Sequence, residues 1–344
     1  MLGIIMKPTK CTERCISEIH ACHFRYLGQK KYGELLDLLY DGAILLLKHD
    51  QQTSGADLAI LLVDVLIKSE ASTSEELFSK LSRLFGMISS DVPERETFLA
   101  NALQWSIKGS QQFKSGHPQL HQSIAQIFWK GRTSKLFYTV VYFLNSDLEP
   151  KYSALLDYKF SEKNYTLARY HFLHSTDGSG CATMLVELHR QRGYSSEVDL
   201  FIAQAVLQYL CLHNKTSAKD VFDSYTTQHP NIKKTGPPYI LPLLNFIWFL
   251  LKVVESGKLA AFTVLCREYQ TSIERDPCYI DYLDKIAQIF FGVPPPRPRN
   301  QGLFGNLLQS FLSGLDDSDS EDESQSSHPR ASTSRQHMET DELD

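Results

Sequence analysis

Metal coordination is the first chemistry that the residue types suggest, because thiols and imidazoles gather near the N-terminus. Cys11 and Cys15 are followed closely by His20, Cys22 and His23. Cysteine and histidine are the usual ligands of structural zinc, but the spacing of this set as a whole matches no usual zinc site. We therefore expect no metal here.

Two histidine pairs have the spacing of one helix face. His117 and His121 are four residues apart, and His171 and His174 are three apart, so each pair lies on one side of a helix. The HExxH motif of zinc peptidases requires glutamate directly after its first histidine, and Pro118 occupies that position. We interpret these histidines as hydrogen-bonding groups between helices.

A phosphate-binding loop is the third candidate, at Gly178-Ser179-Gly180. Such a loop needs a further glycine or a lysine, and a preceding strand. We predict a helix capped after Asp177 instead. The sequence also contains no GxSxG motif, and no two carboxylates pair in an apolar setting as acid–base catalysis requires. We expect no enzyme activity, no catalytic residue, no cofactor and no metal.

Charge is distributed unevenly along the 344 residues, whose formal net charge is −5. Residues 316–344 contain ten acids and two arginines, a net −8, which leaves about +3 on the rest. A nucleic-acid-binding surface would need concentrated positive charge.

The odd number of scattered cysteines, seven, fits free thiols in a reducing compartment. No signal peptide and no apolar run of about 20 residues is evident, so we expect a cytosolic protein that does not insert into membranes.

Apolar residues recur at intervals of three and four along most of the chain, which indicates helices. Proline and small polar residues mark where the helices begin. We predict helices at 31–49, 53–70, 73–88, 93–108, 118–130, 163–174, 178–192, 194–213, 215–228, 239–255, 258–272 and 276–291, with a weak one at 302–314. Short connections make neighbouring helices antiparallel, and small residues such as Gly42 permit close crossings. The predicted fold is all-α: a right-handed α-solenoid of stacked antiparallel hairpins, a degenerate tetratricopeptide-like array, with room for one small β-hairpin near 229–241.

The composition changes after Gly292. Residues 293–301 are proline-rich and form a stiff, extended spacer. Residues 302–315 form a short amphipathic segment, and the acidic residues 316–344 have the composition of a disordered tail. Ser318 and Ser320 stand among acids, a setting suited to an acid-directed kinase, although we favour a solubilising tail.

Surfaces for recognition are the remaining candidates. Around one apolar helix the sequence gathers Pro237, Pro238, Tyr239, Phe246, Trp248 and Phe249. Most aromatic residues on such a helix are core residues, but aromatics that line a groove could also bind a partner helix.

Several stretches resemble a known family. They are FRYLGQKKYGELLDLLYDGAILLL, HFLHSTDGSGCATMLVE, EVDLFIAQAVLQYLCLHNK, GPPYILPLLNFIWFLLKVVESGKLAAFTVLCREYQ and GLFGNLLQSFL. The chain resembles the Golgi-to-ER traffic protein four family, also called the thirty-five-kilodalton subunit of the transmembrane-domain recognition complex. The resemblance covers most of the chain.

The resemblance implies a cytosolic adaptor in the biogenesis of tail-anchored membrane proteins. Family members join the targeting ATPase, which docks on the N-terminal helices, to a ubiquitin-like subunit or to a Bag-family scaffold at the other end. For this chain it implies ATPase docking around Arg25, Tyr26, Lys30 and Lys31, and partner binding by the aromatic region. The alternative is a helical-repeat scaffold of another cytosolic complex, such as a proteasome-lid or coat-like assembly.

Two segments depart from the family pattern. Residues 1–22 do not match it, so we place the solenoid at 23–292. Gly131 to Ser161 adds 31 residues between Trp129-Lys130 and the Glu-x-Asn-Tyr turn that begins at Glu162. We hypothesise a retained in-frame intron or a gene-model error, which the genomic codons at the two junctions can test. The alternative is a real lineage-specific loop at a turn tip, where extra length costs only about 0.6 kcal/mol per doubling.

Overall fold

The computed structural model describes residues 9–108, 114–131, 163–233 and 236–295, with side chains from residue 17 onward. The chain divides into two units, Met1–Pro295 and Pro296–Asp344, and every described residue belongs to the first. The division falls inside the proline-rich stretch predicted at 293–301. The weak helix predicted at 302–314 and the acidic tail lie outside the described residues.

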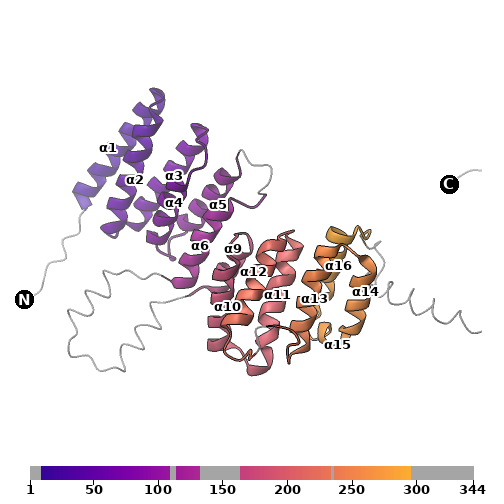
Figure 1. Cartoon of the computed structure of the whole chain (residues 1–344). Helices are drawn as coiled ribbons and strands as arrows, with labels where there is room; N and C mark the ends of the chain where they lie inside the picture. The colour runs from indigo at the N-terminus through magenta and orange to yellow at the C-terminus, as the bar shows by residue number, and fades with distance from the viewer. Residues whose placement is uncertain (1–8, 109–113, 132–162, 234–235, 296–344) are drawn as a thin grey trace, which may run out of the picture. The chain divides into compact units, whose positions relative to one another are not determined.

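Helices make up almost all regular structure in the described residues, and the predicted all-α solenoid class is confirmed (Figure 1). The first group is α1 (Thr9–Gly28), α2 (Tyr32–Lys48), α3 (Gln52–Lys68), α4 (Glu75–Met87), α5 (Glu94–Ile107) and α6 (Pro118–Lys130). The second group is α9 (Tyr165–Leu173), α10 (Gly178–Arg192), η1 (Ser195–Glu197), α11 (Val198–Cys211), α12 (Lys215–Gln228), α13 (Pro242–Ser256), α14 (Leu259–Glu268), α15 (Gln270–Ile273) and α16 (Cys278–Phe291).

The beginnings of several helices are fixed by side chains that accept a hydrogen bond from the first turn. Ser74 caps α4, Asn164 caps α9, Asp177 caps α10 and Asn214 caps α12, each through a backbone N–H three residues on. Each cap satisfies a helix N–H that has no partner inside the helix. The predicted cap after Asp177 is thereby confirmed, with Gly180 N donating to Asp177 Oδ1 at 2.7 Å.

Consecutive helices pack on one another through apolar faces, α1 on α2, α2 on α3, α6 on α9, α9 on α10 and α13 on α14 (Figure 1). Glycine allows the closest approaches. A Cβ atom on Gly42 would lie 2.9 Å from Ile19 Cδ1, and one on Gly55 would lie 2.6 Å from Leu47 Cγ. Helices α1 and α2, and likewise α2 and α3, could not approach as closely with larger residues at these positions.

Some sequence-based expectations differ from the structure. The N-terminal segment begins the helix α1 at Thr9, although residues 1–22 were set apart from the solenoid. The helix predicted at 239–255 begins only at Pro242, and the one predicted at 258–272 is divided at Tyr269. Near 229–241 the described residues 229–233 and 236–241 contain no strand, so they form no β-hairpin. The insertion 131–161 lies outside the described residues except for Gly131, which ends α6.

Candidate docking surfaces

A basic surface forms at the turn between α1 and α2. Arg25, Lys30 and Lys31 are exposed there, and Tyr26 between them is half-buried. The Arg25 guanidinium lies 5.3 Å and the Lys31 ammonium 6.0 Å from the centre of the Tyr26 ring, so the ring orients both cations. Glu34 is the acid paired at this turn, 3.5 Å from Lys31 Nζ. The structure thus brings together all four residues of the expected ATPase-docking site.

Phe24 is an exposed residue that the sequence analysis did not single out. Its side chain is 71% exposed, beside the basic turn and on the same helix, α1. Ile19 and His23, one turn apart, are buried and mark the face of α1 that packs inward. An exposed phenylalanine next to three cations makes this end of α1 a surface that could bind an acidic partner with an apolar centre.

The aromatic region divides into core and surface. Tyr239 and Phe246 are only 7% and 0% exposed, which corrects their assignment as partner-binding residues. The Tyr239 ring packs edge-on against Phe222, and the Phe246 ring lies 5.8 Å from that of Tyr269. Tyr239 therefore packs the loop before α13 on α12, and Phe246 packs α13 on Tyr269, so neither side chain can reach a partner directly.

The remaining members of this region are accessible. Pro237 and Pro238, joined by a cis peptide bond, are exposed, Trp248 is half-buried, and Phe249 is 42% exposed. Ile240, which the sequence analysis did not name, is 78% exposed. We call Pro237, Pro238, Ile240, Trp248 and Phe249 the 237–249 surface. Within it the Trp248 and Phe249 rings contact each other, 4.9 Å apart between centroids, and such exposed aromatic pairs are candidates for protein binding.

The side chain of Asn245 fixes the loop that carries this surface. Its Oδ1 accepts a hydrogen bond from Tyr239 N at 2.7 Å, and its Nδ2 donates to Tyr239 O at 2.8 Å. The Asn245 side-chain amide thus provides both hydrogen bonds that the backbone N–H and C=O of Tyr239 would otherwise need from another backbone segment. The two hydrogen bonds therefore tie the loop to α13 at Tyr239.

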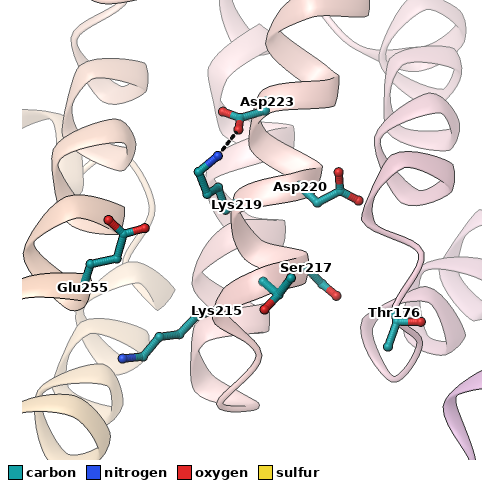
Figure 2. A pocket seen from close by; sticks show the side chains of 8 residues that line it. Thr176, Lys215, Ser217, Lys219, Asp220, Asp223 and Glu255 are labelled. Carbon is teal, nitrogen blue, oxygen red and sulfur yellow. Dashed lines mark hydrogen bonds and ion pairs between the residues drawn. The ribbon is translucent and has the colours of Figure 1, made fainter.

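An open hollow of about 390 Å³ lies at the beginning of α12 (Figure 2). Its polar lining includes Lys215, Lys219, Asp220, Asp223 and Glu255. Lys219 and Asp223 form an ion pair at 2.7 Å, one turn apart on α12. Acids and lysines alternate here, so neither charge is concentrated and no ligand class is favoured.

Two of the four histidines singled out in the sequence, His121 and His171, form a buried hydrogen bond between helices, as expected. His117 instead accepts from Gln119 N–H at the beginning of α6, and His174 bonds to the Tyr170 carbonyl of its own helix. His121 Nδ1 on α6 lies 2.8 Å from His171 Nδ1 on α9. His121 Nε2 lies 3.1 Å from the carbonyl oxygen of Ser115, which can only accept, so Nε2 carries the proton. His121 Nδ1 must then accept from His171 Nδ1–H. Burial lowers the pKa of His121 to about 4 and that of His171 to about 3.

A second histidine pair repeats this arrangement in the next hairpin. His229 Nε2, just after α12, lies 2.9 Å from His189 Nδ1 on α10. His189 Nε2 donates to Tyr194 O at 2.9 Å, and His229 Nδ1 accepts from Asn231 N–H at 3.2 Å. Backbone groups therefore fix the orientation of both rings. These histidines position helices and are not arranged as metal ligands.

Within the described ranges, no three His, Cys, Asp or Glu side chains gather in a way that could hold a metal ion. The side chains of Cys11 and Cys15 lie outside the described part of the chain, as do Ser318 and Ser320. In the same described ranges, no helix has both the length and the apolar character that a membrane crossing requires.

The fold and the two exposed surfaces define a class of protein: an all-α array of helical hairpins whose distinctive surfaces suit protein partners. The family model described as Golgi to ER traffic protein 4 matches residues 29–312. The chain belongs to this family.

Individual relatives agree with this assignment. The Golgi to ER traffic protein 4 homolog of Oryzias latipes is 49% identical over 303 residues, which cover 88% of this chain and 83% of the relative. The Homo sapiens homolog is 47% identical over 300 residues, covering 87% and 81%. Among solved structures, a "Crystal structure of C. therm. Get4" superposes with a TM-score of 0.67 at 23% identity, covering 90% of this chain and 92% of that one. At this identity the match concerns the fold.

Proposed function

We propose that this chain is a non-catalytic cytosolic adaptor in the post-translational targeting of tail-anchored membrane proteins to the endoplasmic reticulum. It bridges the targeting ATPase and a pretargeting complex that contains a ubiquitin-like subunit or a Bag-family scaffold. It binds neither nucleic acid nor the membrane interior. The observation that carries the proposal is the family match over residues 29–312.

Two unlike surfaces on different helices support a bridging role. The basic turn of Arg25, Lys30 and Lys31 lies at the end of α1 and directly after it, whereas the 237–249 surface lies on and before α13. One is charged and suits an acidic face of the ATPase, and the other is apolar and suits a hydrophobic segment of the pretargeting complex. A scaffold that binds both raises the effective concentration of each for the other.

Affinity purification of the full-length chain from cytosol, followed by mass spectrometry, tests the basic turn. The variant Arg25→Glu/Lys30→Glu/Lys31→Glu should lose the ATPase by at least about tenfold and keep the pretargeting partners, because reversed charges repel an acidic face. The control reverses three exposed cations elsewhere, Arg83, Lys108 and Arg190. Equal loss in the control, or no loss in the variant, would place ATPase docking elsewhere.

The same purification tests the 237–249 surface. Ile240→Asp/Phe249→Asp should lose the ubiquitin-like subunit or the Bag-family scaffold and retain the ATPase, because a buried unpaired carboxylate opposes an apolar interface. Leu45→Asp is the control, since Leu45 is also exposed, 48%, but lies on α2. Absence of all three partners from the wild-type sample, with the protein folded and helical, would refute the adaptor role itself.

A further inference from the structure

Arg169 on α9 is a half-buried cation that pairs with no carboxylate among the described residues. Its Nη1 donates to Gln204 Oε1 at 2.8 Å and its Nη2 to Gln208 Oε1 at 2.7 Å, both on α11. Its Nε–H is buried and has no acceptor. A guanidinium has five N–H donors, so the protein uses two of them, both with neutral amides.

The position of the Arg169 guanidinium is fixed by ordered neighbouring side chains. Gln208 Nε2 donates to the hydroxyl oxygen of Tyr282 on α16 at 2.9 Å, which fixes the amide that receives Arg169. Helix α11 also packs directly on both α9 and α16. Three helices therefore orient one charged fork, a degree of order that favours recognition.

No carboxylate pairs with Arg169 anywhere in the described part of the chain. Elsewhere on α11 a buried charge does have an opposite charge beside it: the fully buried Asp199 forms an ion pair with Arg275, whose Nη1 donates to Asp199 Oδ2 at 2.6 Å. Removing a cation from water without an opposite charge is expensive. An acid at Gln204 would differ from the present residue only by replacing the amide with a carboxylate, so the absence of a counter-charge is not forced by packing.

The residues around the site are partly exposed, although the Arg169 Nε atom itself is buried. Gln204 and Gln208 belong to the partly exposed stripe of α11, most of whose other residues are buried, and Arg169 and Tyr282 on the flanking helices are also half-buried. Phe201, one turn before Gln204, adds a half-buried apolar side chain to the same stripe. A segment lying along α11 would thus meet an apolar contact followed by a positive charge.

We propose that Arg169 binds the carboxylate of an Asp or Glu side chain of a protein partner that lies along α11 between α9 and α16. A planar carboxylate matches the fork of one guanidinium and supplies the single negative charge that the site lacks, whereas a phosphate group carries up to about two charges and would need a second cation. This contact involves neither the basic turn nor the 237–249 surface and does not depend on the proposed function.

The full-length chain can be tested with N-acetyl-glutamate methylamide as the probe and N-acetyl-glutamine methylamide as its neutral control. The readout is the guanidinium N–H signal of Arg169 in a proton–nitrogen NMR spectrum, assigned by its loss in Arg169→Lys. The glutamate derivative should shift this signal at matched ionic strength, and the glutamine derivative should not.

Gln204→Glu is the matched variant, because it places a carboxylate on the same guanidinium from within the chain. It should raise the thermal unfolding midpoint and weaken probe binding by about tenfold or more, since the fork is already occupied. If this variant fails to fold, Arg169→Met, which removes the charge, should abolish the shifts that the glutamate derivative causes in the backbone amide signals of residues 201–208 of the wild type. No shift in the wild type, an equal shift with the glutamine derivative, a response retained in both variants, or a shift with inorganic phosphate alone would each overturn the proposal.

Discussion

Mild acid should destabilise this protein through the buried pair His121–His171. Both rings are neutral in the folded state, because His121 donates to Ser115 O and accepts from His171. Burial is the main cause of both lowered pKa values; His121 lowers the pKa of His171 further, and neighbouring His174 lowers both. A proton added to His121 Nδ1 would also face the N–H of His171. The unfolded chain therefore binds protons that the folded chain excludes.

The size of this effect follows from the two pKa values. Each histidine has a pKa of about 6.5 when unfolded, and about 4 for His121 or about 3 for His171 when folded. Their contribution to stability is fully present above pH ~6.5 and declines as the pH falls toward the folded values. At pH ~5 each histidine has lost about 2 kcal/mol, so the pair has lost about 4 kcal/mol. Domains of ordinary stability have about 5–15 kcal/mol in total.

Urea unfolding followed by circular dichroism at several pH values between about 7.5 and 5 would measure this loss. His171→Gln retains an N–H that can donate to His121 but cannot titrate, so its pH-dependent loss should be smaller by about 2 kcal/mol. His49→Gln is the control, since His49 is exposed at the end of α2. Equal pH dependence in wild type and His171→Gln, or constant stability over this range, would refute the reasoning.

Three further predictions concern local contacts and chain length. Asp177→Ala, which removes the cap of α10, should lower the free energy of unfolding by about 1 kcal/mol in urea. Asn245→Ala removes both hydrogen bonds to the backbone of Tyr239 and should cost about 2 kcal/mol, with faster amide hydrogen exchange in residues 236–241. Deletion of residues 131–161 should preserve the helical circular dichroism spectrum and raise the free energy of unfolding by up to about 2 kcal/mol, because a shorter connection is easier to close.

The helices were largely predictable from the sequence, because their apolar periodicity and caps are local signals. The first part of α1 was not included in the predicted solenoid. The buried face of α1 contains Ile19 and His23, with cysteine nearby, and lacks the leucines that make α2 and α3 easy to recognise. Helix α13 begins at Pro242 and not at Tyr239 as predicted, because proline is favoured in the first turn of a helix. The residues before Pro242 form a loop that is hydrogen-bonded to Asn245.

The residues of the candidate docking surfaces were predictable only as regions. Helix α13 is apolar around most of its circumference, so its sequence does not say which face meets solvent. Phe246 is buried and Phe249, three residues on, is 42% exposed, a difference set by which helices pack on α13. The role of His121 and His171 as links between helices was predicted, but their mutual pairing depends on the packing of α6 against α9. Such partners come from tertiary structure, which local periodicity does not encode.

The junction between α6 and α9 bears on the origin of residues 131–161. Asn164 N donates to Phe128 O at 3.0 Å, so the residues that flank the added segment are hydrogen-bonded to each other. Without those 31 residues, Phe128 and Asn164 would be five positions apart, and the same contact would be the six-to-one hydrogen bond that commonly ends a helix. Trp129 Nε1 and Lys163 Nζ both donate to Glu187 on α10, which secures each end separately. The geometry at this point is that of the shorter chain, so the array is complete without the insertion, whether its source is a retained intron or a lineage-specific loop.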